Sequence, residues 1–276
     1  MSFLQSFAGT LTTGSNEFTG GAGNDTFKAP VDVVVNPADG TQSNVNTIQA
    51  VDTLIGGDGE DTLNITAAAN IEFGSISEIE NVNIKSVENL VADTTAYTDV
   101  ENLNVTQVSA TKTSNIDAAG TTDIDVSMKA ANATVDVDGG NDVNVALTDV
   151  TDAADVVTIG GNAAAPKGDI TVSMTGAKYT VADTDTLSAV AVTGGTSVTV
   201  DQVASSDTTA AATDGAAGTI TQGAVTVTAG ANTETVTVTQ DASQGAVNGA
   251  EAAEATMSTQ EVVFTGMDLG ETASLN

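Results

Sequence analysis

Apolar and polar residues alternate in short segments along much of the chain. These segments are rich in β-branched residues and end at Gly, Asn, Asp or Ala. Alternation of period two with this residue bias indicates short strands that bury one face. No long stretch combines helical periodicity with caps at both ends, and residues 250–255 are the best local helix candidate. The pattern therefore predicts an all-β chain, with its clearest strands at residues 123–128, 133–139, 142–148, 156–161, 169–176 and 197–202.

Between residues 67 and 200 the strand pattern repeats itself. The segment IENVNI at residues 79–84 returns 21 residues later as VENLNV at residues 100–105. Short strands with an internal repeat predict a β-solenoid, a parallel β-helix or β-roll with a few loop insertions. A sandwich of two sheets is the alternative, because it also has short alternating strands with frequent turns. In a solenoid the equivalent Asn81 and Asn102 are expected to stack as a ladder between coils.

Glycine motifs punctuate the first 66 residues. The segment TGGAGNDTFKA at residues 19–29 is followed, 36 residues on, by IGGDGEDTLNI at residues 55–65. Each motif has a weaker copy nine residues earlier, at residues 14–18 and 52–54. Pro30 to Gln49 separates the two motifs and is predicted to be an insertion or loop.

The residue types of these motifs suit a calcium-binding turn. Gly20, Gly21 and Gly23 are expected to take positive φ angles, which would direct backbone carbonyls at a cation. Phe27 is expected to point into the core. Flexible sets of six to eight oxygen ligands favour Ca²⁺ over Mg²⁺. The candidate ligands, through backbone or side-chain oxygens, are Gly20, Ala22, Asn24, Asp25, Asp52, Gly56, Asp58, Glu60 and Asp61.

A third acidic segment, VDVDGGNDVNV at residues 135–145, adds Asp138 and Asp142 to the candidate ligands. It lacks the full motif, so a plain hairpin turn explains it equally well. A further site that uses Glu80 and Glu101 is a weaker alternative.

Composition removes several classes of function. The chain has 37 acidic and 6 basic residues, a formal charge of −31, and no His or Cys. Such a chain is repelled by nucleic-acid backbones, and it has no residues for His- or Cys-based nucleophiles or ordinary zinc sites. No pair of carboxylates stands out as catalytic, so no enzyme activity is expected. Bound cations would relieve the self-repulsion of the fold.

The motifs GGAGNDTFK and GGDGEDTLN resemble the G-G-x-G-x-D-x-U-x repeat of RTX proteins, which bind calcium in a parallel β-roll. Together with SISEIENVNI and the Thr/Val/Ala-rich repeats that follow, they make the chain similar to RTX-type surface-layer proteins of Gram-negative bacteria and related large secreted surface proteins. The resemblance implies type I secretion, calcium-driven folding outside the cell and assembly into a lattice.

The resemblance sets the expected function. The chain is expected to be a calcium-dependent structural protein at a bacterial cell surface, with further copies of itself, bridged by calcium, as partners. The alternative is a module of a secreted RTX adhesin or biofilm-matrix protein that binds a carbohydrate or host surface, and a cell-surface polysaccharide is the second expected partner. The N-terminus lacks the basic region of a Sec signal, and no apolar run reaches the length of a membrane span.

Three segments are predicted along the chain. Residues 1–66 form a calcium-binding β-roll segment, residues 67–200 form β-helix repeats, and residues 201–276 form a strand region with loops that begins a further domain. In the last segment, residues 201–218 and 240–256 are predicted loops. Residues 224–240 are predicted to be either a hairpin or two consecutive faces of a coil.

Overall fold

The computed structural model describes residues 6–129, 134–150, 156–161, 164–176, 184–206, 219–244, 256–258, 261–266 and 272–275. Within these ranges the regular elements are strands, and no helix is long and apolar enough to cross a membrane. The helix candidate at residues 250–255 lies outside the described residues.

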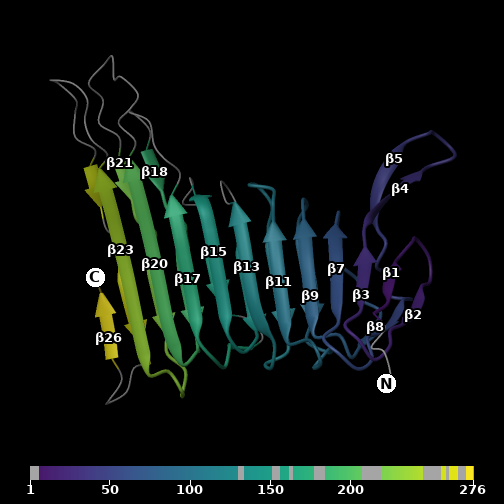
Figure 1. The fold of residues 1–276 in the computed structure, drawn as a ribbon. Helices are drawn as coiled ribbons and strands as arrows, with labels where there is room; N and C mark the ends of the chain where they lie inside the picture. The colour runs from purple at the N-terminus through teal and green to yellow at the C-terminus, as the bar shows by residue number, and fades with distance from the viewer. Residues whose placement is uncertain are drawn as a thin grey trace.

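An 11-stranded parallel sheet runs the length of the molecule (Figure 1). Neighbouring strands in this sheet are two or more elements apart in sequence, so the chain leaves the sheet and returns once per coil. The strands, in spatial order, are β1 (Ala8–Thr10), β3 (Thr26–Ala29), β7 (Thr62–Ala67), β9 (Asn81–Ser86), β11 (Asn102–Gln107), β13 (Asp123–Lys129), β15 (Val143–Val150), β17 (Ile170–Gly176), β20 (Ser197–Ser206), β23 (Thr235–Gln244) and β26 (Thr272–Leu275).

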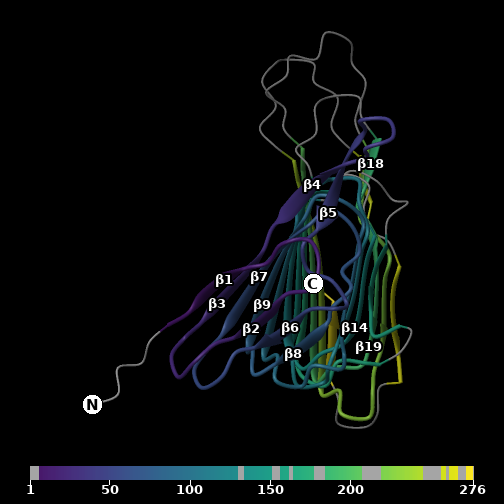
Figure 2. The ribbon, with the colours of Figure 1, turned by 90° about the vertical axis from the view of Figure 1, so that its right-hand side faces the viewer.

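Shorter parallel sheets form the second layer, which Figure 2 shows beside the first in a view along the stack of coils. Three strands cover the first coils, namely β2 (Glu17–Thr19), β6 (Thr53–Ile55) and β8 (Ser75–Ser77). Seven strands continue the layer, namely β10 (Leu90–Thr94), β12 (Ser114–Ala118), β14 (Val135–Gly139), β16 (Val156–Ile159), β19 (Ala189–Thr193), β22 (Val225–Thr228) and β25 (Val262–Thr265). A third small sheet holds β18 (Thr184–Thr186), β21 (Thr219–Thr221) and β24 (Thr256–Ser258).

This architecture confirms the predicted all-β solenoid. Strands pair in parallel from coil to coil, and among the described strands the antiparallel pairing is that of β4 (Val31–Val35) with β5 (Gln42–Asn46). A sandwich is therefore the wrong alternative. The 21-residue repeat is one coil, because Asn81 pairs with Asn102 and Val82 with Leu103.

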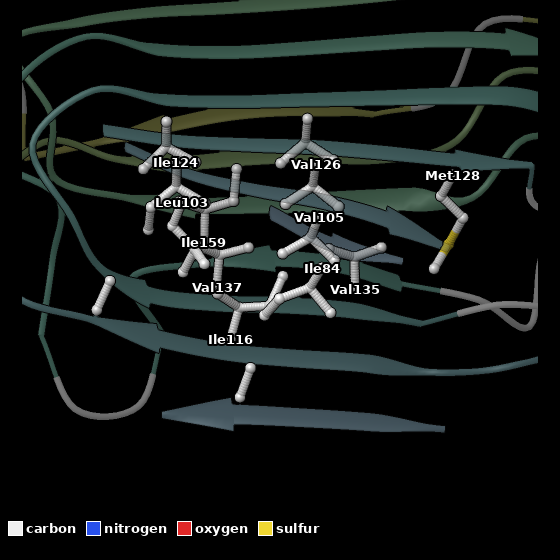
Figure 3. Packing of buried hydrophobic residues seen from close by; sticks show 14 of the residues in the cluster. Ile84, Leu103, Val105, Ile116, Ile124, Val126, Met128, Val135, Val137 and Ile159 are labelled. Atoms are coloured by element: carbon white, nitrogen blue, oxygen red, sulfur yellow. The ribbon is translucent and has the colours of Figure 1, made fainter. Parts of the chain in front are cut away.

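The core is a stack of aliphatic side chains between the two layers. In β13 exposed and buried residues alternate along all seven positions, so Ile124, Val126 and Met128 point inward. They meet residues of the facing layer such as Ile116 and Val137 (Figure 3). Identical inward positions of successive coils lie in register, which builds continuous apolar columns and leaves little room for aromatic rings.

Polar residues form ladders where the strands face solvent. The Asn102 side-chain amide donates to Asn81 Oδ1 at 3.0 Å, and Asn104 donates to Asn83 Oδ1 at 3.0 Å. Asn83 in turn donates to Asn64 Oδ1 at 3.0 Å. The predicted Asn81–Asn102 ladder is confirmed, and a second one runs beside it.

Pro30 to Gln49 is an insertion, as predicted, but it contains the β4–β5 hairpin rather than an irregular loop. The hairpin stands off one edge of the solenoid (Figure 2), and Val33, Val34 and Val35 are exposed on it. The two ends of the insertion meet where the Thr47 hydroxyl donates to the Pro30 carbonyl at 2.6 Å. The strands on either side of the insertion, β3 and β6, keep their parallel pairing with the neighbouring coils.

The C-terminal segment corrects two loop predictions. Residues 201–206 belong to β20 and residues 240–244 to β23, because backbone pairing between these strands continues past the end of the alternating pattern. The rest of both predicted loops lies outside the described residues, apart from Thr256 at the start of β24. Residues 224–240 are consecutive faces of one coil, since β22 and β23 belong to different sheets. The 11-stranded sheet passes through all three predicted segments.

Candidate metal centre

The two glycine motifs lie side by side in the structure although 36 residues separate them in sequence. Thr26 pairs with Thr62 in β3 and β7, and Phe18 pairs with Leu54 in β2 and β6. The turns at residues 20–25 and 56–61 stack directly, with the Gly20 N–H donating to the Ile55 carbonyl at 2.8 Å. Because the hairpin is looped out, the motifs are adjacent coils of one short roll rather than separate sites.

A column of acidic side chains runs down this edge of the solenoid. The Asp61 carboxylate accepts the Asp25 N–H at 2.7 Å, and the Glu80 carboxylate accepts the Asp61 N–H at 2.7 Å. Asp25 itself accepts the N–H groups of Phe7 and Gly21, each at 2.5 Å. Each carboxylate therefore caps the turn of the preceding coil, which stabilises a negative charge by direct hydrogen bonds.

The weaker nonapeptide copies form the matching column at the opposite edge. The Asn16 N–H donates to Asp52 Oδ1 at 2.7 Å, and the Gln49 N–H donates to Asp52 Oδ2 at 2.7 Å. Asn16 also bonds the backbone of its own turn, with its amide group donating to the Thr12 carbonyl at 2.8 Å. Asn16 and Asp52 are both buried. The nine-residue period thus corresponds to half a coil, with a polar residue at each corner.

The glycines act differently from the sequence prediction. Positive φ angles occur in the second motif at Gly57 and Gly59, but not at Gly20, Gly21 or Gly23 of the first. The reason is close approach: a Cβ on Gly20 would overlap Asp25 Oδ2 and the Gly56 carbonyl oxygen.

A Cβ on Gly56 would likewise overlap Asp61 Oδ2 and the Glu78 carbonyl oxygen. In both turns a carboxylate oxygen and a backbone carbonyl oxygen of the next coil converge on the space that the glycine leaves free. Converging oxygen atoms of these two kinds are what a hard cation prefers.

Asp61 is the most deeply buried acid of the column. It is 0% exposed, and its Oδ2 is buried without a hydrogen-bond partner. Burial raises the pKa of Asp61, the Asp25 N–H opposes that rise, and the charges of Asp25, Glu80 and Glu60 add to it. A buried carboxylate oxygen with no donor is costly unless a cation or proton satisfies it.

The other candidate ligands of the two turns lie on the surface. Ala22, Asn24, Asp58 and Glu60 are exposed. Asn24 joins the two turns, because its Oδ1 accepts the Glu60 N–H at 3.2 Å. Their side chains therefore lie on the solvent-facing surface of the stacked turns.

Asp138 and Asp142 lie on either side of a coil corner. Asp138 is buried in β14, where it contributes with burial to the raised pKa of the neighbouring Asp117. Asp142 is exposed before β15 and accepts the Asp169 N–H at 2.8 Å. Because β14 and β15 lie in different sheets, the Gly139–Gly140 turn is a coil corner and the predicted hairpin is wrong.

Glu78 was missed from the sequence, and Glu80 was named only for a separate, weaker alternative site with Glu101. Glu80 is the direct successor of Asp61 in the column, and Glu78 supplies the carbonyl that faces Asp61. The available signal was the position of Asp25, Asp61 and Glu80, each immediately before a strand of the long sheet. Unequal coil lengths obscured that equivalence.

In the part of the chain that the structure describes, no group of three or more acidic side chains is arranged to hold a metal ion by itself. The stacked turns instead offer carboxylates together with backbone carbonyls. With Asp61 Oδ2 unsatisfied, this donor set fits a calcium ion. The sequence matches no model of a known protein family, and no curated protein is significantly similar to it.

Proposed function

We propose that this chain is a calcium-dependent structural protein of a bacterial cell surface that assembles with copies of itself into a surface layer or similar array. The observation that carries the proposal is the buried, unpartnered Oδ2 of Asp61 beside the Glu78 carbonyl, in a turn stacked on a second turn of the same kind. Asp25 and Asp61, with the carbonyl oxygens of Gly56 and Glu78, would hold the ion.

Bound calcium supplies positive charge that satisfies these oxygens. The stacked turns exist only in the folded coil, so the free energy of binding adds directly to the free energy of folding. At a formal charge of −31 the calcium-free chain repels itself. Low calcium therefore favours the unfolded chain, which suits export through a type I channel, and high calcium outside the cell favours the coil.

The first test measures folding. The melting temperature by circular dichroism is expected to rise with calcium and to fall with EGTA. Replacing Asp25 and Asp61 by Asn keeps an oxygen that accepts a backbone N–H but removes both charges, so the calcium-dependent rise should be lost. The matched control is Asp32→Asn with Asp39→Asn on the exposed hairpin, which changes the net charge equally. Equal melting temperatures of the wild type with and without calcium would contradict the proposal.

The second test measures assembly. Negative-stain microscopy should show ordered sheets or filaments of the purified chain after calcium is added. A folded protein that stays monomeric and needs a carbohydrate or host ligand would instead favour the adhesin or biofilm-matrix module. The expected secretion and surface location rest on the resemblance of the two nonapeptides to RTX repeats.

A further inference from the structure

The outer face of the 11-stranded sheet has an uneven distribution of charge. On β3, β7, β9 and β11 the outward side chains include no carboxylate, and the charged ones are Lys28 and Lys85. On β13 to β17 the same face carries Asp123 and Asp125, with Asp142 and Asp169 directly before the next two strands, and its one lysine on β13, Lys129, is paired with Asp149. A chain with 37 acidic residues thus keeps four adjacent strands free of outward acids.

Lys28, Lys85 and Lys167 are the described lysines outside the ion pairs of the described residues, and Lys28 and Lys85 are the two that lie on the four strands free of outward acids. The ion pairs of the described residues are Lys112 with Glu88 at 2.6 Å and Lys129 with Asp149 at 2.7 Å, and neither includes Lys28 or Lys85. Both lysines are exposed, and both line a depression of about 310 Å³ beside Asn64 and Asn83. Two cations without an anion in so acidic a protein point to an anionic partner.

A depression of opposite charge lies on the same face. A second depression of about 350 Å³ is lined by Asp123, Asp125, Asp142 and Asp169. β11 is the middle strand of the seven from β3 to β17, and its Asn102 and Asn104 also line the second depression. The outward residues of β11 are the uncharged Asn102, Asn104 and Thr106 (Figure 1 shows the strand order).

We propose that two copies of this chain dock through the outer face of the 11-stranded sheet, related by a two-fold axis parallel to β11. This operation preserves the strand direction and exchanges the two halves of the face. It places β3 opposite β17 of the second copy and β9 opposite β13. By the strand register, Lys28 then lies opposite Thr171, with Asp169 one outward position away, and Lys85 lies opposite Ser127, with Asp125 one outward position away. The long lysine side chains span that offset, and each contact occurs twice, as an isologous interface requires.

The alternative two-fold axis, perpendicular to the strands, would place like charges opposite one another. It would set each strand opposite itself, so that Lys28 and Lys85 would face lysines and Asp123 and Asp125 would face carboxylates. Like charges placed opposite one another disfavour a complex, so the charge pattern selects one orientation as well as the face.

The size of the face sets the expected strength. The strands from β3 to β17 span about 30 Å across the sheet at ~4.8 Å per strand. With strands of about 20 Å this gives roughly 600 Å² per partner, which is at the weak end of specific interfaces. A weak polar contact suits an array that repeats it many times. The inference rests on the proposed self-assembly and adds the surface and partner orientation.

The test is charge reversal in the full chain at one fixed calcium concentration, with association measured by sedimentation velocity. Lys28→Glu with Lys85→Glu should weaken self-association at least about tenfold, and so should Asp125→Lys with Asp169→Lys. When the two variants are mixed, they should associate with each other. The variant that combines all four substitutions should associate with itself. Lys112→Glu is the control: Lys112 lies outside the strands of this face, so reversing its charge should have little effect.

Circular dichroism shows whether each variant is folded, so that a loss of docking is not confused with a loss of folding. The mixture is a second check, because two folded variants with complementary charges should restore the contact that each variant alone has lost. If the wild type associates and the Lys28/Lys85 variant associates equally well, the proposed face is wrong while self-assembly stands. If the wild type folds with calcium yet remains monomeric at every concentration, the proposed self-assembly itself fails.

Discussion

At the scale of single residues, the edge column places charged groups where a solenoid would otherwise leave backbone N–H groups unpaired. Asp25, Asp61 and Glu80 each turn inward and accept an N–H of the neighbouring coil or turn. Gly20 and Gly56 make this possible because they leave space for a carboxylate and a carbonyl oxygen. A glycine and an acid five residues later therefore act as one unit.

Replacing Gly56 by Ala tests that unit. The added Cβ would overlap the Glu78 carbonyl, which belongs to the backbone and cannot rotate away. We expect a loss of about 3 kcal/mol or more in the free energy of unfolding, measured by urea denaturation with calcium present. Gly14→Ala is the control: Gly14 has a φ of 106° but open space around it, so the loss there should be about 1 kcal/mol. Equal losses at the two sites would contradict the packing explanation.

The pH dependence of stability is expected to follow the buried acids. Burial raises the pKa of Asp117, and Asp138, Asp93 and Asp136 add to that rise. A carboxyl whose pKa is raised by folding binds its proton more tightly in the folded state. Its contribution is therefore fully present below the ordinary Asp value of 3.8 and is lost as pH rises through the raised folded value.

The calcium-free protein should accordingly melt at higher temperature as pH falls from neutrality towards 3.8. Asp117→Asn should raise the melting temperature at neutral pH and flatten this dependence, because it removes the like-charge contact. Asp32→Asn on the exposed hairpin is the control for a simple change in net charge. A pH profile that Asp117→Asn leaves unchanged would show that the cause lies elsewhere.

At the scale of elements, the solenoid tolerates insertions because each coil closes before and after them. The β4–β5 hairpin enters and leaves between Pro30 and Thr47, which share a hydrogen bond at its base. Asn46 joins the hairpin to the next coil, since its Oδ1 accepts the Ala68 N–H at 2.8 Å. The rest of the hairpin is mostly exposed and pairs with itself.

Excising the hairpin tests this independence. Replacing residues 33–44 by a two-residue turn should change the free energy of unfolding by less than about 1 kcal/mol, because loop length enters the closure entropy only logarithmically. The calcium-dependent rise in melting temperature should persist. Asn46→Ala in the intact chain should cost about 0.5–1.5 kcal/mol, since it removes hydrogen bonds to backbone groups that are partly or fully exposed to water. A shortened chain that fails to fold would mean that the hairpin supports the coil.

At the scale of the whole molecule, the protein is a one-dimensional stack in which each coil contacts its neighbours. Stability in such a stack is approximately the sum of coil and interface contributions, so a ligand at one end acts mainly on nearby coils. The stacked glycine turns lie in the first coils, and the later coils are held by aliphatic columns and polar ladders. On the proposed function, calcium would stabilise mainly the first coils, whereas packing and polar ladders stabilise the later ones.

Hydrogen exchange measured by mass spectrometry can separate these regions. Adding calcium should increase protection most in β2, β3, β6 and β7, and progressively less towards β17 and β20. The gradient follows from nearest-neighbour coupling between coils. Uniform protection along the chain would indicate a single cooperative unit, and protection confined to β13–β17 would place the dominant ions on the outer acidic face.

Local pattern was enough to predict several features. Alternation identified the strands around residues 123–128 and 169–176, and the 21-residue repeat identified one coil and its Asn81–Asn102 ladder. Phe27 lies in the core as its place after the turn predicted, with 0% exposure. These features depend on residues within one strand or one coil, which a sequence records directly.

The tertiary structure alone decided what depends on register between coils. It placed the turn of Asp25 against that of Asp61 across a looped-out hairpin, put a coil corner between Asp138 and Asp142, and left Asp61 Oδ2 without a hydrogen-bond partner. It also placed Lys28 and Lys85 on one half of a sheet face and Asp123, Asp125, Asp142 and Asp169 on the other. Coils differ in length, so sequence spacing does not show which residues become neighbours; that depends on which insertions leave the stack, and pairing in the folded backbone determines it.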